Sequence, residues 1–139
     1  MSDLAIEVRR RAASPCEYCQ IPEAAFRRPF HIEHIVAKQH GGLTLLDNLA
    51  LACWACNLKK GPNLTGIDPE SREITRLFDP RKDRWDDHFK LIVSGGVRLG
   101  VDIRGRTALG RTTVRLLDMN NEMRKRIRHE LWREGMIRA

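Results

Sequence analysis

Two Cys-x-x-Cys pairs constrain this chain more than any other feature of its sequence. Cys16 and Cys19 form the first pair, and Cys53 and Cys56 form the second. Each pair places two thiolates on one tight turn, and two such turns together supply the tetrahedral set of four sulfurs that Zn²⁺ prefers. Because four thiolates close the coordination shell, the spacing predicts a structural zinc ion rather than a catalytic one.

Two other interpretations of the cysteines stay open at this level, namely four buried free thiols or a redox-active pair. A redox Cys-x-x-Cys motif is expected within a strand-helix-strand unit, and these pairs lack that context. Disulfides are not expected, because the N-terminal segment MSDLAIEVRRR carries its positive charges after its apolar residues, the reverse of a secretory signal. We therefore expect a cytoplasmic protein. A structural zinc ion bound by the four thiolates would contribute about 10 kcal/mol to its folding.

Length and charge narrow the class of protein further. The chain has 139 residues, which is typical of one domain, so we predict a single domain over residues 1–139. No apolar run approaches the roughly 20 residues that span a bilayer, and no membrane contact is expected. The 25 Lys and Arg residues outnumber the 18 Asp and Glu residues, for a formal charge of +7. Such a charge favours a polyanionic partner, of which nucleic acid is the commonest.

The hydrophobic pattern around the cysteines predicts the order strand, loop, strand, helix. The segment PFHIEHIVA alternates and is rich in β-branched residues, which is typical of a strand, and Gly41-Gly42 marks the loop that follows. Gly61-Pro62 ends the helix, because glycine favours a helix stop and proline cannot continue the helix. The predicted elements are a strand over 29–37, a strand over 48–52 and a helix over 53–60.

Elsewhere the sequence predicts further helices and a hairpin. Ser2 or Asp3 caps the first helix, and Ser94-Gly95-Gly96 supplies a turn that glycine favours. The region 61–80 is rich in turn formers and predicts ordered loops with one short helix. Together the elements predict an α+β fold with helix 3–13, a short helix at about 71–77, hairpin strands HFKLIV (88–93) and VRLGVDI (97–103), and helices 107–120 and 121–134.

Three of the five histidines, His31, His34 and His40, lie between the two cysteine pairs, with Glu33 beside them. Imidazole supplies a base near neutral pH, and a carboxylate supplies an oxygen ligand for a hard divalent cation. Adjacent residues of a strand face opposite sides, so Glu33 and His34 share a site only where the strand twists or ends. His31 lies on the face of Glu33 and is the alternative supporting residue or ligand. The residues predict a second metal site beside the structural zinc.

Three segments resemble the zinc-containing branch of the HNH endonucleases: CEYC (16–19), HIEHIVAKQHGG (31–42) and DNLALACWACNLKKG (47–61). They are similar to the family pattern C-x-x-C, [DE]-H-[IV], G-G, N-L-x-L and C-x-x-C-N-x-x-K-G, with every element in order. The resemblance covers residues 16–61, about a third of the chain. It implies a ββα-metal core, to which the hairpin and helices of 85–135 would be accessory.

The resemblance also implies a role for each matching residue in hydrolysis of a phosphodiester bond to a 5′-phosphate and a 3′-hydroxyl. A single Mg²⁺ or Mn²⁺ ion would stabilise the charge on the phosphate and the leaving oxygen. From the residues alone, Lys60 also suits a helix C-terminus by its charge, and His40 suits a loop-shaping role. The implied roles are His34 as general base, Glu33 and Asn57 as ligands of the catalytic ion, Asn48 as brace of the loop that holds His34, and Lys60 and His40 as contacts to substrate phosphate.

These observations predict a Mg²⁺- or Mn²⁺-dependent DNA endonuclease. The chief alternative is a zinc-stabilised nucleic-acid-binding module without catalysis, and a third is a zinc scaffold for protein partners. Residues 104–139 hold ten Lys or Arg against four Asp or Glu, which indicates either a solvated helix face or a surface that binds the phosphate backbone. No base-reading motif is present, so we expect low sequence specificity or specificity supplied by a partner.

Overall fold

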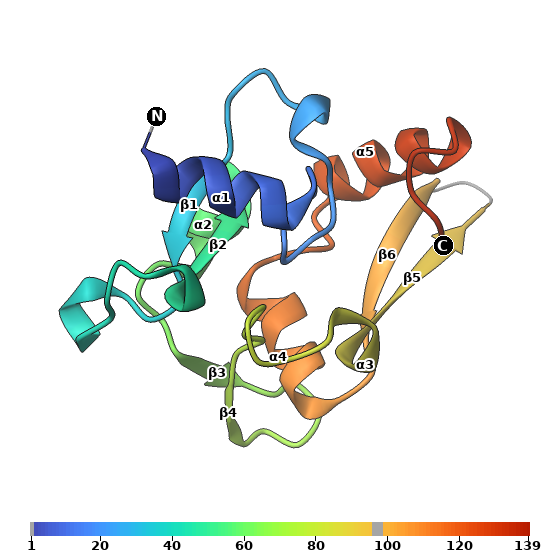
Figure 1. The fold of residues 1–139 in the computed structure, drawn as a ribbon. Coiled ribbons are helices and arrows are strands. Elements are labelled where there is room, and N and C mark those ends of the chain that lie inside the picture. The colour runs from blue at the N-terminus through green and yellow to red at the C-terminus, as the bar shows by residue number, and fades with distance from the viewer. Residues whose placement is uncertain (1, 96–98) are drawn as a thin grey trace. The chain divides into compact units, whose positions relative to one another are not determined.

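The computed structural model describes residues 2–95 and 99–139, which form helices and three small antiparallel sheets (Figure 1). Contacts group the chain into two compact units, Met1–Leu64 with Asp79–Asp83, and Thr65–Phe78 with Arg84–Ala139. The predicted α+β class is confirmed. One domain over residues 1–139 stays a prediction, as does the accessory role of 85–135. Within the described residues, no helix is both long and apolar enough to cross a membrane.

The first unit contains the predicted strand, loop, strand and helix. Strand β1 (His31–His34) pairs with β2 (Leu49–Ala52) in antiparallel register, with His34 opposite Leu49. Helix α2 (Trp54–Lys60) follows directly and ends at Gly61, whose φ of 50° suits glycine. Three short 3₁₀ turns complete this part: Glu23–Ala25, Lys38–His40 and Leu46–Asn48.

Helix α1 (Asp3–Ala12) packs on β2, whose four residues are all buried (Figure 1). The Ser2 hydroxyl caps the helix by accepting from the backbone N–H of Ala5 at 3.1 Å. From the last turn, the Arg11 guanidinium donates to the carbonyls of Leu46 at 2.8 Å and Leu49 at 2.6 Å. These two bonds fasten α1 to the start of β2.

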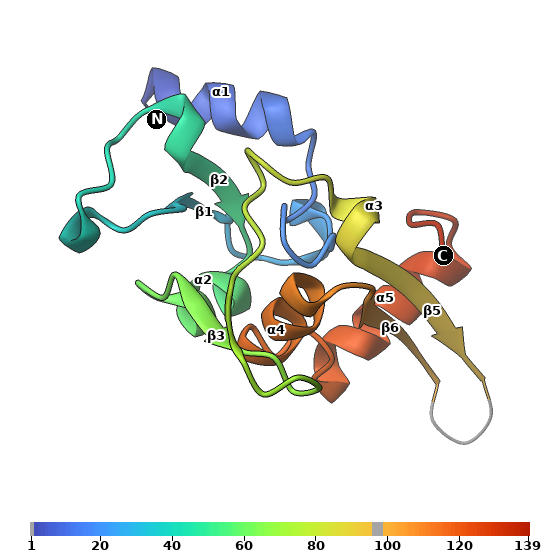
Figure 2. The ribbon, with the colours of Figure 1, turned by 90° about the horizontal axis from the view of Figure 1, so that it is seen from below.

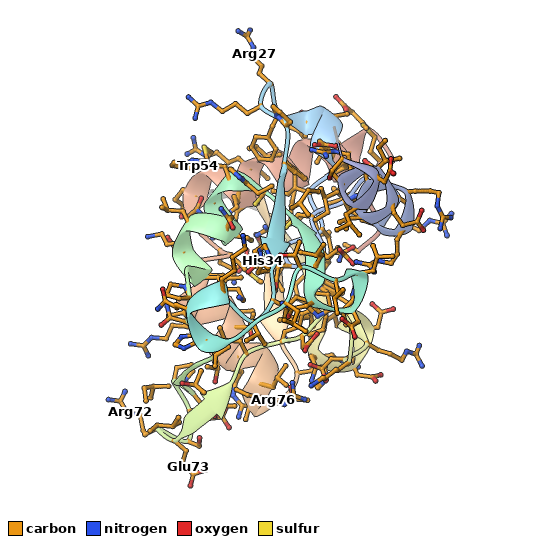
Figure 3. The ribbon with its side chains drawn as sticks, turned by 60° about the vertical axis from the view of Figure 1, so that its left-hand side comes forward. Arg27, His34, Trp54, Arg72, Glu73 and Arg76 are labelled. Carbon is orange, nitrogen blue, oxygen red and sulfur yellow. The ribbon has the colours of Figure 1, made fainter. Side chains whose placement is uncertain are left out.

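The second unit begins with a hairpin that corrects one prediction. The short helix expected at about 71–77 is wrong, because β4 (Ile74–Arg76) lies there and pairs with β3 (Thr65–Ile67). The Asp68 carboxylate accepts from two backbone N–H groups that follow it, which builds a turn, and Arg72 has a φ of 68° that no helix permits. Figure 3 shows Arg72 and Glu73 projecting from this turn.

The predicted C-terminal hairpin and two helices are confirmed. The short helix α3 (Trp85–His88) leads into β5 (Phe89–Ser94), which pairs with β6 (Gly100–Gly105), and α4 (Ala108–Leu116) and α5 (Glu122–Arg133) both pack against β6 (Figure 2). Residue 96 of the predicted turn and the first two residues of the predicted strand 97–103 lie outside the described residues.

Two predicted elements are longer than the observed ones. The strand predicted over 29–37 is regular only over His31–His34. The next N–H group, of Ile35, still bonds to the Asn48 carbonyl, and the chain then leaves the hairpin. The helix predicted over 107–120 ends at Leu116, and Asp118 has a φ of 49°. The apolar spacing identified the strand and the helix, but it did not show at which residue the backbone leaves its regular geometry.

Two buried arginines fasten α5 to the rest of the second unit. The Arg124 guanidinium donates to the carbonyls of Leu117 and Asp118, just after α4. The Arg128 guanidinium donates to the carbonyl of Val101 at 2.8 Å and to that of Met119 at 2.7 Å. Both side chains are fully buried. Carbonyl groups near a helix C-terminus carry partial negative charge, so they offset part of the cost of burying these cations.

The start of α4 comes so close to neighbouring backbone that only glycine fits. A Cβ atom on Gly110 would lie 2.1 Å from the His88 carbonyl oxygen, and one on Gly105 would lie 2.3 Å from the Arg111 nitrogen. The Thr107 hydroxyl caps this helix at Gly110 and also bonds to the His88 ring. Glycine therefore sets the distance between α4, β6 and the end of α3.

Replacing Gly110 by Ala is expected to lower the free energy of unfolding by about 1–3 kcal/mol, because backbone must move to relieve the overlap. Urea denaturation measures this change. Gly95→Ala is the matched control, since a Cβ atom there meets nothing within 4 Å. Equal stability of the two variants would contradict the close approach.

Candidate metal centre and histidine site

The four cysteines come together in the first unit as their spacing predicts. Their sulfur atoms lie within 4.8 Å of one another, and all four residues are buried and free of disulfides. The sulfurs of Cys19 and Cys53 are 3.7 Å apart. Sulfurs bound tetrahedrally to one Zn²⁺ at about 2.3 Å are separated by about 3.8 Å. The donor set and its spacing therefore fit a structural zinc ion.

Backbone hydrogen bonds hold each cysteine pair in a tight turn. The Gln20 N–H donates to the Cys16 carbonyl at 3.0 Å, and Gln20 has a φ of 70°. The second pair opens α2, where the Cys56 N–H donates to the Cys53 sulfur at 3.4 Å. Burial raises the pKa of the Cys16 and Cys56 thiols, so the protein interior alone does not favour their thiolates. A bound cation supplies the charge that stabilises them.

Glu33 points into the first unit, where it forms a buried ion pair. Its Oε1 lies 2.7 Å from the Lys60 Nζ, and the two side chains are only 5% and 2% exposed. The Lys60 ammonium also donates to the Ile35 carbonyl at 2.7 Å. Burial raises the pKa of Glu33, while Lys60 and the Tyr18 hydroxyl act to lower it. In this arrangement the Lys60 ammonium is not accessible to a substrate phosphate.

His34, at the end of β1, is partly exposed (Figure 3). Its Nε2 lies 2.9 Å from the Thr44 hydroxyl. Partial burial and the positive charge of Lys38 lower the pKa of His34 below its ordinary value of 6.5. The imidazole is therefore neutral at pH 7, which is the form that accepts a proton.

Asn48 ties together the loop between the two strands. Its Oδ1 accepts from the Val36 N–H at 2.9 Å, and its Nδ2 donates to the carbonyls of Val36 at 3.0 Å and Leu43 at 2.9 Å. Gly42 is part of the same closure, because a Cβ atom there would lie 1.7 Å from the Val36 oxygen. The loop fixed in this way carries Thr44 to His34.

Sequence reasoning missed Thr44. A threonine in a loop has no distinctive pattern, and nothing in the spacing shows that it returns to a residue ten positions earlier. The only available signal was the Gly41-Gly42 turn with Asn48, which indicates that the loop closes on itself.

The other predicted site residues take separate places. Asn57 is partly exposed on α2, one turn before Lys60 and so on the same side of the helix. His31 and His40 are exposed, at the start of β1 and the end of the 3₁₀ turn Lys38–His40. Among residues 2–95 and 99–139, the four cysteines are the one group of three or more His, Cys, Asp or Glu able to hold a metal ion.

Comparison with known families gives one match. Residues 16–63 match the family model described as HNH endonuclease, and this segment lies wholly within the first unit. It includes both cysteine pairs, β1, β2 and α2, so the predicted resemblance is confirmed, and the cysteine cluster fits the zinc branch. Comparison with curated proteins and with solved structures gave no match.

Removing one sulfur is expected to remove the zinc ion and destabilise the first unit. For Cys19→Ser we expect less than stoichiometric zinc by elemental analysis and a lower melting temperature, because the tetrahedral shell is broken. His40→Ala is the control, since His40 is exposed and outside the cluster. Full zinc content in the Cys19→Ser protein would contradict the four-sulfur site.

Breaking the buried ion pair is expected to cost more than replacing both of its members. Lys60→Met leaves the Glu33 carboxylate uncompensated and should lower the free energy of unfolding by about 3–5 kcal/mol. The double variant Glu33→Gln, Lys60→Met should recover most of this loss, as urea denaturation can measure. Lys59→Met, at an exposed position of the same helix, is the control. A double variant less stable than Lys60→Met would be inconsistent with the pair.

Proposed function

Since residues 16–63 carry an HNH endonuclease segment, we propose that this protein is a Mg²⁺- or Mn²⁺-dependent DNA endonuclease in which His34 is the general base. The observation that carries the proposal is the state of His34 within that segment. Its side chain is partly exposed and hydrogen-bonded to Thr44, and its pKa is lowered. A base for hydrolysis must be reachable by water and unprotonated at the working pH.

The contact with Thr44 is compatible with the form of His34 that the reaction needs. When the Thr44 hydroxyl oxygen accepts from Nε2–H, the other ring nitrogen, Nδ1, keeps its lone pair for a proton. Nδ1 then takes a proton from a water molecule as the water oxygen bonds to phosphorus. The bond from phosphorus to the 3′ oxygen breaks, and the 3′ oxygen takes a proton from a second water molecule, while His34 returns its proton to the solvent. The products are a 5′-phosphate and a 3′-hydroxyl.

Glu33 and Asn57 would hold the catalytic ion. A carboxylate and an amide oxygen are hard donors suited to Mg²⁺ or Mn²⁺, which takes its remaining ligands from water and phosphate. Asn57 lies on the side of α2 from which Lys60 reaches Glu33, so both donors border the same part of the unit. When bound, the ion supplies Lewis-acid stabilisation of charge on the phosphate.

The alternative is a zinc-stabilised nucleic-acid-binding module without catalysis. One observation favours it, namely that the Glu33 carboxylate is buried and already neutralised by Lys60 at 2.7 Å. Such a carboxylate contributes to stability without an ion. Cleavage therefore decides between the two functions, because binding is common to both.

His34→Ala is expected to reduce cleavage of supercoiled plasmid about 10²–10⁴-fold in Mg²⁺ or Mn²⁺, because general-base catalysis contributes about that much. Gln39→Ala, at an exposed position of the 3₁₀ turn Lys38–His40, is the matched control, and zinc content and melting temperature should equal those of the wild type in both variants. Because the pKa of His34 is lowered from its ordinary value of 6.5, wild-type cleavage should change little from pH 8 down to about pH 6.5 and should decline only at lower pH, as His34 becomes protonated.

Two outcomes would overturn the proposal. Cleavage by His34→Ala at the wild-type rate would remove His34 from the reaction. Binding of plasmid by both proteins, with cleavage by neither in either metal, would establish the binding module instead.

A further inference from the structure

The basic C-terminal region is less charged at its surface than its sequence indicates. Of the ten Lys and Arg residues in 104–139, six are already engaged within the second unit. They bond to backbone carbonyls or pair with acids: Arg106 with the Asp86 carbonyl, Arg111 with Asp68, Arg124 and Arg128 with carbonyls, Lys125 with Asp102, and Arg133 with Glu130. The surface on which the remaining cations lie is therefore the one best able to bind an anion.

Two of them border a pocket of about 480 Å³ in the second unit. Arg104 comes from β6 and Arg115 from α4, and both are exposed. Within the described parts of the chain, neither forms an ion pair. Arg111 and Glu70 also line the pocket. The other lining residues are small or apolar, namely Pro69, Gly105 and Val114.

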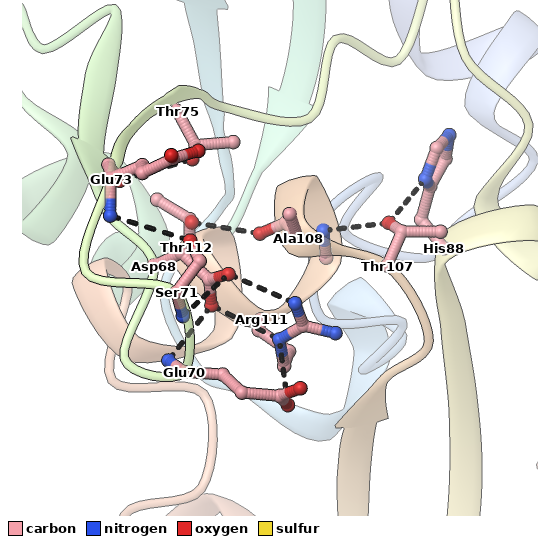
Figure 4. Close-up of polar contacts among 11 residues, drawn as sticks. Asp68, Glu70, Ser71, Glu73, Thr75, His88, Thr107, Ala108, Arg111 and Thr112 are labelled. Carbon is pink, nitrogen blue, oxygen red and sulfur yellow. Dashed lines mark hydrogen bonds and ion pairs between the residues drawn. The ribbon is translucent and has the colours of Figure 1, made fainter.

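Arg111 lines this pocket, and polar contacts to Asp68 and Glu70 hold its side chain (Figure 4). Its Nε and Nη2 donate to the two carboxylate oxygens of Asp68 at 3.0 and 2.9 Å. Asp68 is fully buried and also accepts from the backbone N–H groups of Glu70 and Ser71. Arg111 holds the pKa of Asp68 well below its usual range, so the pair stays ionised. The Arg111 Nε also lies 3.3 Å from the Glu70 carboxylate, so Asp68 and Glu70 together exceed the charge of Arg111 by one negative charge. Arg104 and Arg115 outnumber that charge and give the pocket lining its net positive charge.

A third cation lies beside them across the sheet. Lys90 on β5 is the direct antiparallel partner of Arg104 on β6, and both side chains are exposed. Directly opposed residues project from the same face, where like charges repel each other and destabilise the hairpin. An anion held between them would remove this repulsion.

We propose that Lys90, Arg104 and Arg115 bind the phosphate backbone of a nucleic acid, with the pocket receiving one phosphate and its sugar. Arginine recognises phosphate through paired N–H donors, and the apolar lining suits the carbon atoms of a ribose. The contact reads no base, which agrees with the lack of a base-reading motif. The inference rests on the proposed function only in taking nucleic acid as the ligand, because it concerns binding and not cleavage.

The test measures binding with cleavage removed. The full-length His34→Ala protein is titrated into a fluorescent DNA duplex of mixed sequence, and anisotropy is recorded from low to high salt. Adding Arg104→Gln and Arg115→Gln should weaken binding about 10-fold or more and reduce the slope of log K against log salt by about 2, because about 0.9 counterions are released per phosphate contact. Lys90→Gln should reduce the slope further.

Arg126→Gln with Arg138→Gln is the matched control, since it removes the same charge from exposed residues that do not line the pocket. This control should change affinity less than about twofold. Equal losses in both double variants would overturn the inference in favour of net charge alone, as would unchanged binding by the Arg104 and Arg115 variant. Equal melting temperatures verify that the variants fold.

The two proposals fail separately. Weakened binding by the Arg104 and Arg115 variant, with no cleavage by wild type, would support this surface and refute the nuclease. Cleavage that needs His34, with binding that ignores Arg104 and Arg115, would refute the surface alone.

Discussion

The four-sulfur centre is the constraint on which the first unit depends. It joins the turn after α1 to the start of α2, through cysteines that are at least 34 positions apart, as Cys19 and Cys53 are. Closing a chain segment of this length costs conformational entropy, which a zinc ion bound by the four sulfurs would offset. The enclosed segment contains both strands and the loop, so the four cysteines join the two ends of the segment that carries His34.

Strand geometry then divides two adjacent residues between two tasks. On β1, Glu33 faces the interior and pairs with Lys60, whereas His34 is partly exposed and bonds to Thr44. The buried pair joins β1 to α2, and Asn48 closes the loop between β1 and β2. A buried ion pair and a partly exposed imidazole are therefore supplied by neighbouring side chains of one short motif.

Sequence pattern predicted elements well where a local rule was strong. Cysteine spacing identified the metal centre, and glycine with alternating apolar residues identified the two hairpins at β1–β2 and β5–β6. It failed at Ile74–Arg76, where a strand and not a helix forms, because the turn depends on Asp68 and its partner Arg111, 43 residues away. Thr44 was missed for the same reason, since its role arises from a contact with His34 and not from its neighbours.

The sequence by itself determined the four-cysteine cluster, the α+β class and the similarity of residues 16–63 to the HNH endonucleases, because these follow from residue types at fixed short spacings. Only the tertiary structure decided which charges are available. A count of charged residues does not distinguish Lys60, Arg124 and Arg128 from surface cations. In the structure these three are buried and bonded, while Arg104 and Arg115 remain exposed. A charge acts on a ligand only where water and solutes reach it, and that exposure is set by packing between segments distant in sequence.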